Sequence, residues 1–279
     1  MTTAISVLHA AAPLLLVTMG ALISEYAGRM AMFLECMINL GAFCCYAFTS
    51  LTGNAAAGCA LAVLTCTAAT VLLERVASRC KANMFLISLA LNMLFAAAAT
   101  FFSATLFGTR GVLYGEQFLF DARSARTATS TVCLIFSAAQ LALLRCTGTG
   151  LRLRISGSDP DVLAAKGISV SAYRTLAWAL AAADAAMCGC ALALRLSSYV
   201  PGMASGRGWT ALAAVFLGKK HPMLVILAVL VFAAAEYASS TAQNLALFRN
   251  VPPSILLALP YITALALIVI VPQKAEEQH

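Results

Sequence analysis

Charged residues are scarce in this chain of 279 residues. They make up 10% of the sequence, less than half of the roughly 25% that is typical of soluble domains. Hydrophobic residues make up 62%, and this balance excludes a soluble globular enzyme. The 8 prolines and 17 glycines are spread among apolar runs, so the chain is neither disordered nor collagen-like.

Histidine is also rare. The three histidines, His9, His221 and His279, lie far apart in the sequence. A membrane-embedded enzyme needs clustered His or acidic ligands near one face, so we expect no catalysis, no bound metal and no cofactor. The phosphate-cradling motif GxxxxGK[ST] is absent as well. If this chain drives transport with ATP, another polypeptide must therefore bind the nucleotide.

The ten cysteines form no CxxC pair, which argues against a zinc or thioredoxin-like motif. Only Cys80 and Cys146 lie near charged loops. The other eight lie in apolar runs, where cysteine behaves as a small buried hydrophobic side chain; they are Cys36, Cys44, Cys45, Cys59, Cys66, Cys133, Cys188 and Cys190.

Long apolar runs dominate what is present. A bilayer core of about 30 Å needs about 20 helical residues, with every backbone polar group bonded internally. The sequence predicts an all-α, polytopic membrane protein that forms a single domain over residues 1–279. A further apolar run, Gly208–Leu217, is too short to cross and predicts a re-entrant or half helix. The eight predicted spans are Val7–Ile23, Met30–Leu51, Ala55–Leu73, Met84–Phe107, Thr129–Leu144, Thr175–Leu194, Pro222–Ala238 and Ser254–Val271.

The net charge of +7 indicates an excess of basic residues in cytoplasmic loops rather than nucleic-acid binding. The largest basic collection lies in the loop 145–174, which we place in the cytoplasm. By alternation, the loop with Arg75, Arg79 and Lys81 is also inside, and the N-terminus is outside. Lys219 and Lys220 come inside if the short run at 208–217 dips in from the outer face.

The loop 145–174 contains a short helix with both ends specified. Asp159 is suited to cap it, Pro160 to occupy its first position and Asp161 to complement its positive end, whereas Lys166 and Gly167 close it. Such a short helix is unstable alone. It therefore needs support from the membrane body or a partner protein, and we expect its apolar set Val162, Leu163, Ala164 and Ala165 to be exposed for a partner. The alternative is a plain connector.

This loop carries a resemblance. Gly150–Arg154 and Gly157–Ile168 resemble the coupling segment of ABC-importer permeases of the branched-chain amino acid, ribose and nucleoside type. Other stretches are similar to the nucleoside branch, although Cys36 stands where Gly is usual. The resemblance covers most of the chain and fades between Thr109 and Leu144. These stretches are Ser24–Gly28, Leu34–Met37, Lys81–Asn83, Ala90–Asn92, Pro201–Trp209, Ala211–Gly218, Pro222 and Glu236.

The resemblance implies a bacterial inner-membrane, multi-pass permease that works with a second permease subunit in a heterodimer, a cytoplasmic ABC ATPase and an extracytoplasmic substrate-binding lipoprotein. The implied cargo is a purine nucleoside or riboflavin, with sugars or branched-chain amino acids as alternatives. Membrane lipid surrounds the chain, and no nucleic acid is involved. The resemblance also implies that a groove of the ATPase subunit receives the coupling segment, represented here by Gly157, Asp159, Pro160, Asp161, Leu163, Ala164, Lys166 and Gly167.

Polar residues at membrane depth are costly and default to functional candidates. Glu35 and Asn39 lie one helical turn apart and so share a face; they either contact substrate or bind helices and backbone groups, and Asn92 has the same two readings. Asp184 is expected to pair with a basic or amide group. The predicted translocation path is Glu35, Asn39, Asn92, Gly206, Arg207, Gly208, Trp209 and Glu236.

The glycine-rich segment 202–209 also has two readings. Glycines permit irregular backbone at membrane depth, which is tolerated where it faces protein or a water-filled path. The segment is therefore either an outer gate or a plain loop with Trp209 at the membrane interface. An ion-coupled secondary transporter remains a rival for the whole chain. It needs internally paired acids and no ATPase partner, and the inverted-repeat symmetry that would favour it is not evident in the sequence.

Overall fold

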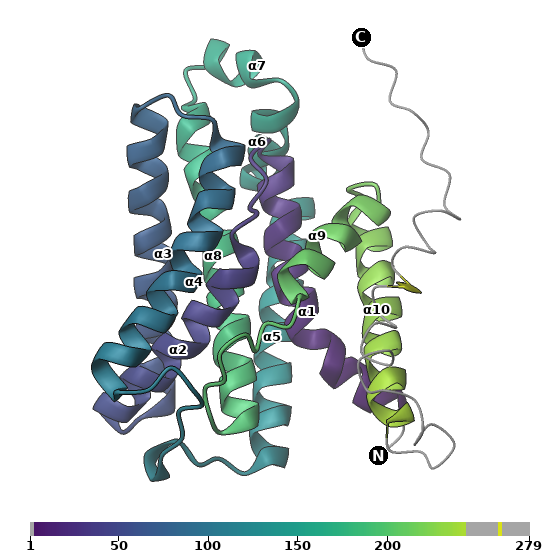
Figure 1. Ribbon diagram of the computed structural model, residues 1–279. Helices are drawn as coiled ribbons and strands as arrows, with labels where there is room; N and C mark the ends of the chain where they lie inside the picture. The colour runs from purple at the N-terminus through teal and green to yellow at the C-terminus, as the bar shows by residue number, and fades with distance from the viewer. Residues whose placement is uncertain (1–2, 244–261, 264–279) are drawn as a thin grey trace.

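The computed structural model describes residues 3–243 and 262–263. Long helices that run up and down past one another make up the bundle (Figure 1). Seven of those in the described residues are long and apolar enough to cross a membrane. They are α1 (Thr3–Tyr26), α2 (Leu34–Thr52), α3 (Ala55–Arg79), α4 (Met84–Phe107), α5 (Ala122–Cys146), α8 (Val170–Leu196) and α10 (Pro222–Ala242).

Shorter elements connect the spans. A 3-10 turn, η1 (Glu116–Phe118), precedes α5, and α6 (Gly148–Ser158) and α7 (Pro160–Ala165) lie between α5 and α8. The helix α9 (Arg207–Leu217) has 11 residues and confirms the predicted half helix. Seven of the eight predicted spans are thus present as helices, and the eighth, 254–271, lies outside the described residues except for 262–263.

The central helix is α8, which contacts α1, α2, α3 and α5. Alanines and a glycine on it are buried, including Ala182, Ala185, Ala186 and Gly189. Such small side chains let helix backbones approach closely, which is how helices associate where lipid removes the usual hydrophobic driving force. By contrast, α3 and α4 expose large apolar side chains such as Leu64, Leu72, Leu86, Met93 and Phe101, as expected of lipid-facing helices.

Several predicted boundaries are wrong. The predicted span Met30–Leu51 begins only at Leu34, because the chain between α1 and α2 is irregular. The span Thr129–Leu144 is part of a longer helix that starts at Ala122, where the Asp121 side chain accepts a hydrogen bond from Ser124 N at 2.9 Å. Hydropathy detects the apolar part of a helix and misses its polar ends, whereas capping groups decide where the helix begins.

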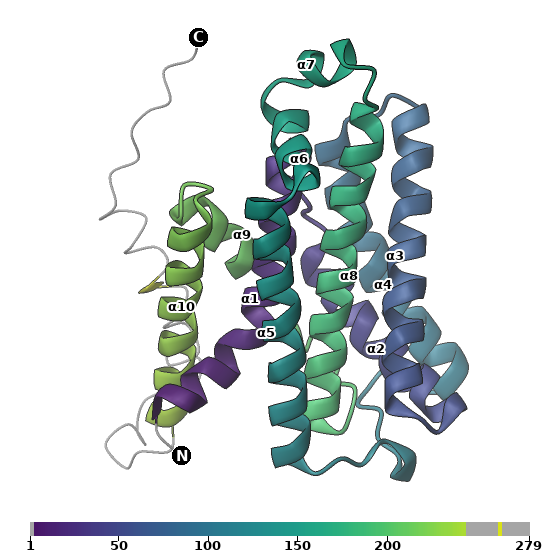
Figure 2. The same ribbon diagram turned by 180° about the vertical axis from the view of Figure 1, so that it is seen from behind.

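The bundle has two distinct ends. The α7 end carries α6, α7 and the turn between α3 and α4, whereas the opposite end carries the turn between α2 and α3 and the segment with η1 (Figure 1). The lower part of α1 bends away toward α10, and Pro13 lies inside this helix. Proline removes a backbone donor and kinks a helix. Seen from behind, α9 and α10 stand to one side, beside α1 (Figure 2).

Candidate functional site: a junction of broken helices and a docking helix

The chain between α1 and α2 enters the bundle without regular structure, so its backbone groups need side-chain partners. Met32 N donates to Ser88 Oγ at 2.6 Å, and Cys36 N donates to Asn92 Oδ1 at 3.1 Å. The Trp178 indole donates to the carbonyl oxygen of Arg29 at 2.8 Å. Asn92 therefore satisfies one of the free N–H groups at the start of α2. Of its two predicted roles, substrate contact or binding of helices and backbone groups, this is the second.

The start of α9 lies directly against the start of α2. The carboxylate of Glu35 accepts hydrogen bonds from Gly206 N at 2.7 Å and from Gly208 N at 2.8 Å. A Cβ at Gly208 would overlap the backbone of Glu35, so only glycine allows this approach. Because a helix N-terminus carries partial positive charge, the starts of α2 and α9 are both electrostatically complementary to this carboxylate.

Asn39 completes this arrangement, which we name the α2–α9 junction and define by Glu35, Asn39, Gly206 and Gly208. The Asn39 Oδ1 atom accepts from Ala204 N at 3.1 Å, and its Nδ2 donates to the Glu35 carbonyl at 3.4 Å. Both predicted polar residues of α2 therefore hold the irregular segment before α9. In this conformation both oxygens of Glu35 and both polar atoms of the Asn39 side chain are hydrogen-bonded to backbone groups.

The segment before α9 is also fastened at its other side. Leu113 and Tyr199 exchange two backbone hydrogen bonds of 2.9 Å each. The Tyr199 ring packs edge-on against Phe43 with their centroids 5.5 Å apart. Burial raises the pKa of Tyr199 to about 12, so its hydroxyl stays neutral at physiological pH. The predicted gate segment 202–209 is thus held at both ends.

Arg207 and Glu236 form an ion pair between α9 and α10. They line a cavity of about 510 Å³, together with Met203 and Arg195. The guanidinium of Arg195 is used elsewhere, since it donates to Thr129 Oγ1 at 2.9 Å, to Ser130 Oγ at 2.7 Å and to the carbonyl of His9. Trp209 is not among the residues that line this cavity, and its exposed fraction is 42%.

The structure contains a further buried ion pair that was not predicted from the sequence. Glu74 is fully buried and pairs with Arg29, and its second oxygen accepts from Thr175 Oγ1 at 2.7 Å. The predicted span ends at Leu73, whereas α3 continues to Arg79, so Glu74 lies inside the helix and not in the loop after it. A signal for this pair was present in the sequence, because Glu74 and Arg29 both lie near the expected cytoplasmic face of the membrane. As expected, Asp184 pairs with an amide, accepting from Gln140 Nε2 at 2.6 Å.

The predicted docking helix exists as α7. Asp159 is its N-cap and accepts from Val162 N at 3.4 Å, Pro160 is its first residue, and Gly167 ends it with a φ of +69°. Val162, Ala164 and Ala165 are exposed as predicted, together with Asp161 and Lys166. The expected exposure of Leu163 is wrong: it is 2% exposed because it anchors this short helix, which contacts α6 and α8.

The loop 145–174 is more ordered than predicted, because α6 fills most of its first half. Gly157 lies so close to the C-terminal end of α1 that a Cβ there would overlap the carbonyl of Tyr26 and the amide of Gly28. Arg154 lies over the Tyr26 ring, 4.9 Å from its centroid, and Arg174 donates to the carbonyl of Ser156 at 3.0 Å. Through these contacts with α1 and α8, the helix α6 connects α7 to the spanning helices.

The turn between α9 and α10 belongs to the same end of the molecule. Lys220 Nζ lies 3.0 Å from Glu25 Oε1, and the Tyr26 hydroxyl donates to the Lys220 carbonyl. The short helix α9 therefore starts at the α2–α9 junction and returns to the α7 end. The sequence predicts this path if the short run at 208–217 brings Lys219 and Lys220 to the cytoplasmic side.

Comparisons with known proteins agree with this geometry. Residues 3–271 match the family described as "Branched-chain amino acid transport system / permease component". The chain is 28% identical to the putative glucose ABC transporter permease protein TsgC13 of Haloferax volcanii, over 93% of this chain and 88% of that protein. It is 28% identical to the guanosine ABC transporter permease protein NupQ of Bacillus subtilis, over 92% and 88%.

A solved structure shares the fold. The match is to a chain of PsaBC from Streptococcus pneumoniae in complex with Fab, with a TM-score of 0.56 and 14% identity. It covers 95% of this chain and 91% of that one. At this identity the likeness concerns the arrangement of the helices alone.

Proposed function

Because the chain belongs to the family of ABC-importer permease components of the branched-chain amino acid type, we propose that it translocates a purine nucleoside or riboflavin, delivered by an extracytoplasmic binding lipoprotein. The chain is a multi-pass membrane protein and a transport subunit, and such a permease implies an ATPase and a binding protein as partners. The finer proposal adds a heterodimer with a second permease subunit in a bacterial cytoplasmic membrane.

The observation that carries the proposed cargo is the 28% identity to a guanosine permease over 92% of this chain. The chemistry of the cavity is compatible with it. Arg126, Arg195 and Arg207 line the cavity beside one carboxylate, that of Glu236. Its wall therefore offers hydrogen-bond donors that suit the hydroxyl groups and ring nitrogens of such a solute.

The proposed mechanism is alternating access. Nucleotide-driven closure of the two ATPase subunits moves α7, and α6 transmits this movement to α1 and α5, which it contacts. The two permease halves then rock against each other and open a path toward the binding protein. Rearrangement of the α2–α9 junction in that movement would free Glu35 and Asn39 to meet the solute.

A sugar is the second candidate, favoured by the equal identity to the putative glucose permease. The experiment that separates the candidates is uptake into proteoliposomes that contain this chain, its partner permease, the ATPase and the binding protein. Labelled guanosine, inosine, riboflavin, glucose and leucine are compared with ATP inside the vesicles. Saturable, ATP-dependent uptake of guanosine, inosine or riboflavin supports the proposal.

Two outcomes contradict it. Uptake of glucose or leucine alone assigns a different cargo to the same importer. Uptake that follows an ion gradient and ignores ATP would instead assign an ion-coupled secondary transporter. A matched control uses a partner ATPase whose catalytic carboxylate is replaced, because it assembles normally and cannot hydrolyse ATP.

A further inference from the structure

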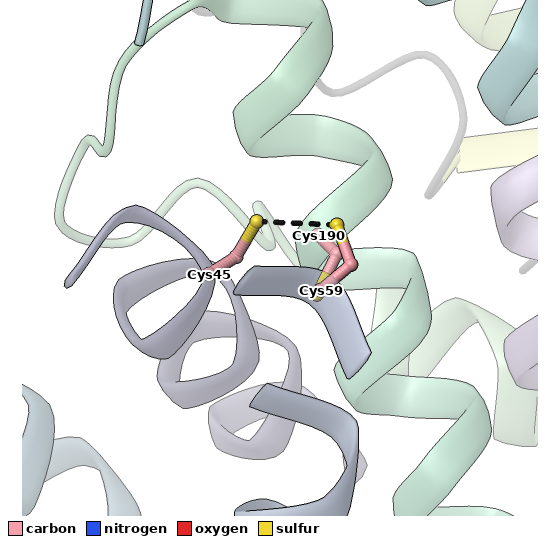
Figure 3. A group of neighbouring side chains, drawn as sticks. All are labelled: Cys45, Cys59 and Cys190. Carbon is pink, nitrogen blue, oxygen red and sulfur yellow. Dashed lines mark hydrogen bonds between the residues drawn. The ribbon is translucent and has the colours of Figure 1, made fainter. Parts of the chain in front are cut away.

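Three cysteine side chains from three different helices meet inside the bundle. Cys45 is on α2, Cys59 on α3 and Cys190 on α8 (Figure 3). The three sulfur atoms lie within 4.8 Å of one another, and the sulfurs of Cys45 and Cys59 are 3.5 Å apart. All three cysteines are free thiols. We name this group the three-thiol cluster.

The spacing suits a single metal ion. Metal–sulfur bonds of about 2.3 Å place three sulfur ligands around one ion about 4 Å apart when the ion lies in their plane. The sulfurs of Cys45 and Cys59 are 3.5 Å apart and no sulfur–sulfur distance in the cluster exceeds 4.8 Å, so small rotations of the side chains bring the sulfurs into range. Three helices already hold the ligands in position, which lowers the entropic cost of binding.

The ligand set selects among ions. Among the described residues, no fourth His, Cys, Asp or Glu joins the group. Structural zinc is almost always four-coordinate and tetrahedral, so three sulfurs leave it one ligand short. Soft sulfur ligands, both thiolate and uncharged sulfur, favour Cu(I), which accepts three sulfur ligands. Hard cations such as Mg²⁺ and Ca²⁺ require oxygen ligands and are excluded.

Burial of charge also favours a monovalent ion. Cys45 and Cys190 are buried, so a complex with net charge would be costly at this depth. When one Cu(I) ion binds three thiols, three copper–sulfur bonds form, one S–H bond breaks and one proton leaves to water. The resulting complex has one thiolate, two thiols and no net charge, and copper keeps its oxidation state.

The cluster is accessible from one end of the bundle. Cys59 is only half-buried, unlike the other two cysteines. It lies about one turn from the start of α3, and Cys45 lies about two turns from the end of α2. These positions are next to the turn between α2 and α3, at the end opposite α7 (Figure 1). Cys59 is therefore the member of the cluster that is most open to the surface of the chain.

We propose that Cys45, Cys59 and Cys190 form a binding site for one Cu(I) ion that ties α2, α3 and α8 together. This inference goes beyond the transport function and does not depend on the identity of the cargo. Bound copper joins three spanning helices at one point, so it stabilises the folded bundle by mass action.

The test is a Cu(I) titration of the purified chain in lipid nanodiscs, without oxygen and against the chromogenic chelator bicinchoninate. The exposed thiols are removed first by Cys80→Ser and Cys146→Ser. We expect one Cu(I) ion per chain to resist the chelator, with three sulfur scatterers in its X-ray absorption spectrum and a raised melting temperature. Each of Cys45→Ala, Cys59→Ala and Cys190→Ala should abolish this ion.

Matched controls use buried cysteines outside the cluster. Cys188→Ala removes a thiol from the same helix as Cys190, and Cys133→Ala removes one from α5; both should retain the ion. Chelator-resistant copper that persists in the Cys45, Cys59 and Cys190 variants overturns the proposal. So does copper that disappears only with Cys44→Ala or Cys66→Ala, which remove thiols of α2 and α3 outside the cluster.

Two further results would overturn it. The first is a Cys45–Cys59 disulfide in chain isolated from cells with thiols blocked, because it removes two of the three ligands. The second is a full-strength copper site in a variant with all three cysteines replaced by alanine. Unchanged elution and melting of the copper-free variants establish that loss of the ion is not loss of the fold.

Discussion

At Glu35, two helices that start inside the bundle meet one carboxylate. Two backbone N–H groups donate to it at 2.7 and 2.8 Å, and Glu35 itself lies in the first turn of α2. Charge-assisted hydrogen bonds are stronger than neutral ones, and the helix dipoles add to them. A carboxylate inside the membrane is costly by hydropathy, and the starts of α2 and α9 offset this cost for Glu35.

Replacing Glu35 by glutamine keeps the size of the side chain and removes its charge. One amide oxygen remains to accept, so we expect a loss of about 2 kcal/mol in the free energy of unfolding and weaker uptake in proteoliposomes. Thermal unfolding in nanodiscs measures the first effect. Glu116→Gln is the matched control, because Glu116 is exposed in the described structure, and it should unfold like the wild type. Equal stability of Glu35→Gln would contradict the role assigned to the α2–α9 junction.

At the scale of the element, we propose that α6 and α7 act as one lever on the spanning helices. Gly157 brings α6 against the end of α1, and Leu163 holds α7 on the body of the protein. The exposed side chains of α7 are left for a partner. An isolated helix of six residues would not be stable in water, so its contacts decide that it forms.

Gly157→Ala should push α6 away from α1, because the atoms that a Cβ would meet belong to backbone. We expect a cost of about 2 kcal/mol from overpacking, and reduced ATP-driven uptake. Gly148→Ala, in the same helix, is the control, since a Cβ there meets nothing within 4 Å. It should be neutral or slightly stabilising through the higher helix propensity of alanine. Similar effects of the two substitutions on thermal unfolding and uptake would refute the lever.

Ala164→Glu places a charge on the exposed face of α7. If this face is seated in a groove of the ATPase, burying the new carboxylate should weaken assembly by about 2 kcal/mol, or roughly thirtyfold in Kd. Co-purification and vesicle uptake measure the loss, and capture of solute by the binding protein should be unchanged. Ala56→Glu makes the same substitution at the exposed start of α3, at the opposite end. Normal assembly of Ala164→Glu would place the ATPase elsewhere.

At the scale of the whole molecule, basic residues gather at the α7 end. Arg79 ends α3, Lys81 is in the turn between α3 and α4, and Arg152 is on α6, all elements that reach that end (Figure 1). The turn with Lys219 and Lys220 is held against the end of α1. Cytoplasmic loops carry an excess of Lys and Arg. The half helix α9 makes this distribution possible. It leads the chain back toward the α7 end before α10 begins, whereas without it α10 would begin at the opposite end, where α8 finishes.

This orientation predicts which thiols a membrane-impermeant maleimide can reach. In single-cysteine variants expressed in bacteria, Cys80 and Cys146, which are exposed near the α7 end, should react only after the membrane is opened. A cysteine introduced by Ala56→Cys should react in intact cells. The reverse pattern would show that the α7 end faces outward, and an ATPase would then have to dock at the other end.

Much of the fold follows from local pattern. Long apolar runs identify seven spanning helices within the described residues, and the residues that cap α7 identify that helix. The sequence by itself also determined the class of protein: low charge and long apolar runs indicate a multi-pass membrane protein, and the motifs of the loop 145–174 resemble those of ABC-importer permeases. These properties depend on composition and on neighbours along the chain, so they can be predicted without coordinates.

The partners of the buried polar groups were decided only by the tertiary structure. Glu35 meets the start of α9, Glu74 meets Arg29 and Thr175, and three cysteines from three helices converge. Leu163, expected on the surface, is buried. Hydropathy records how costly each group is in lipid, but the group that relieves the cost lies on another helix. Its identity depends on how helices rotate and cross, which is set by packing over the whole bundle.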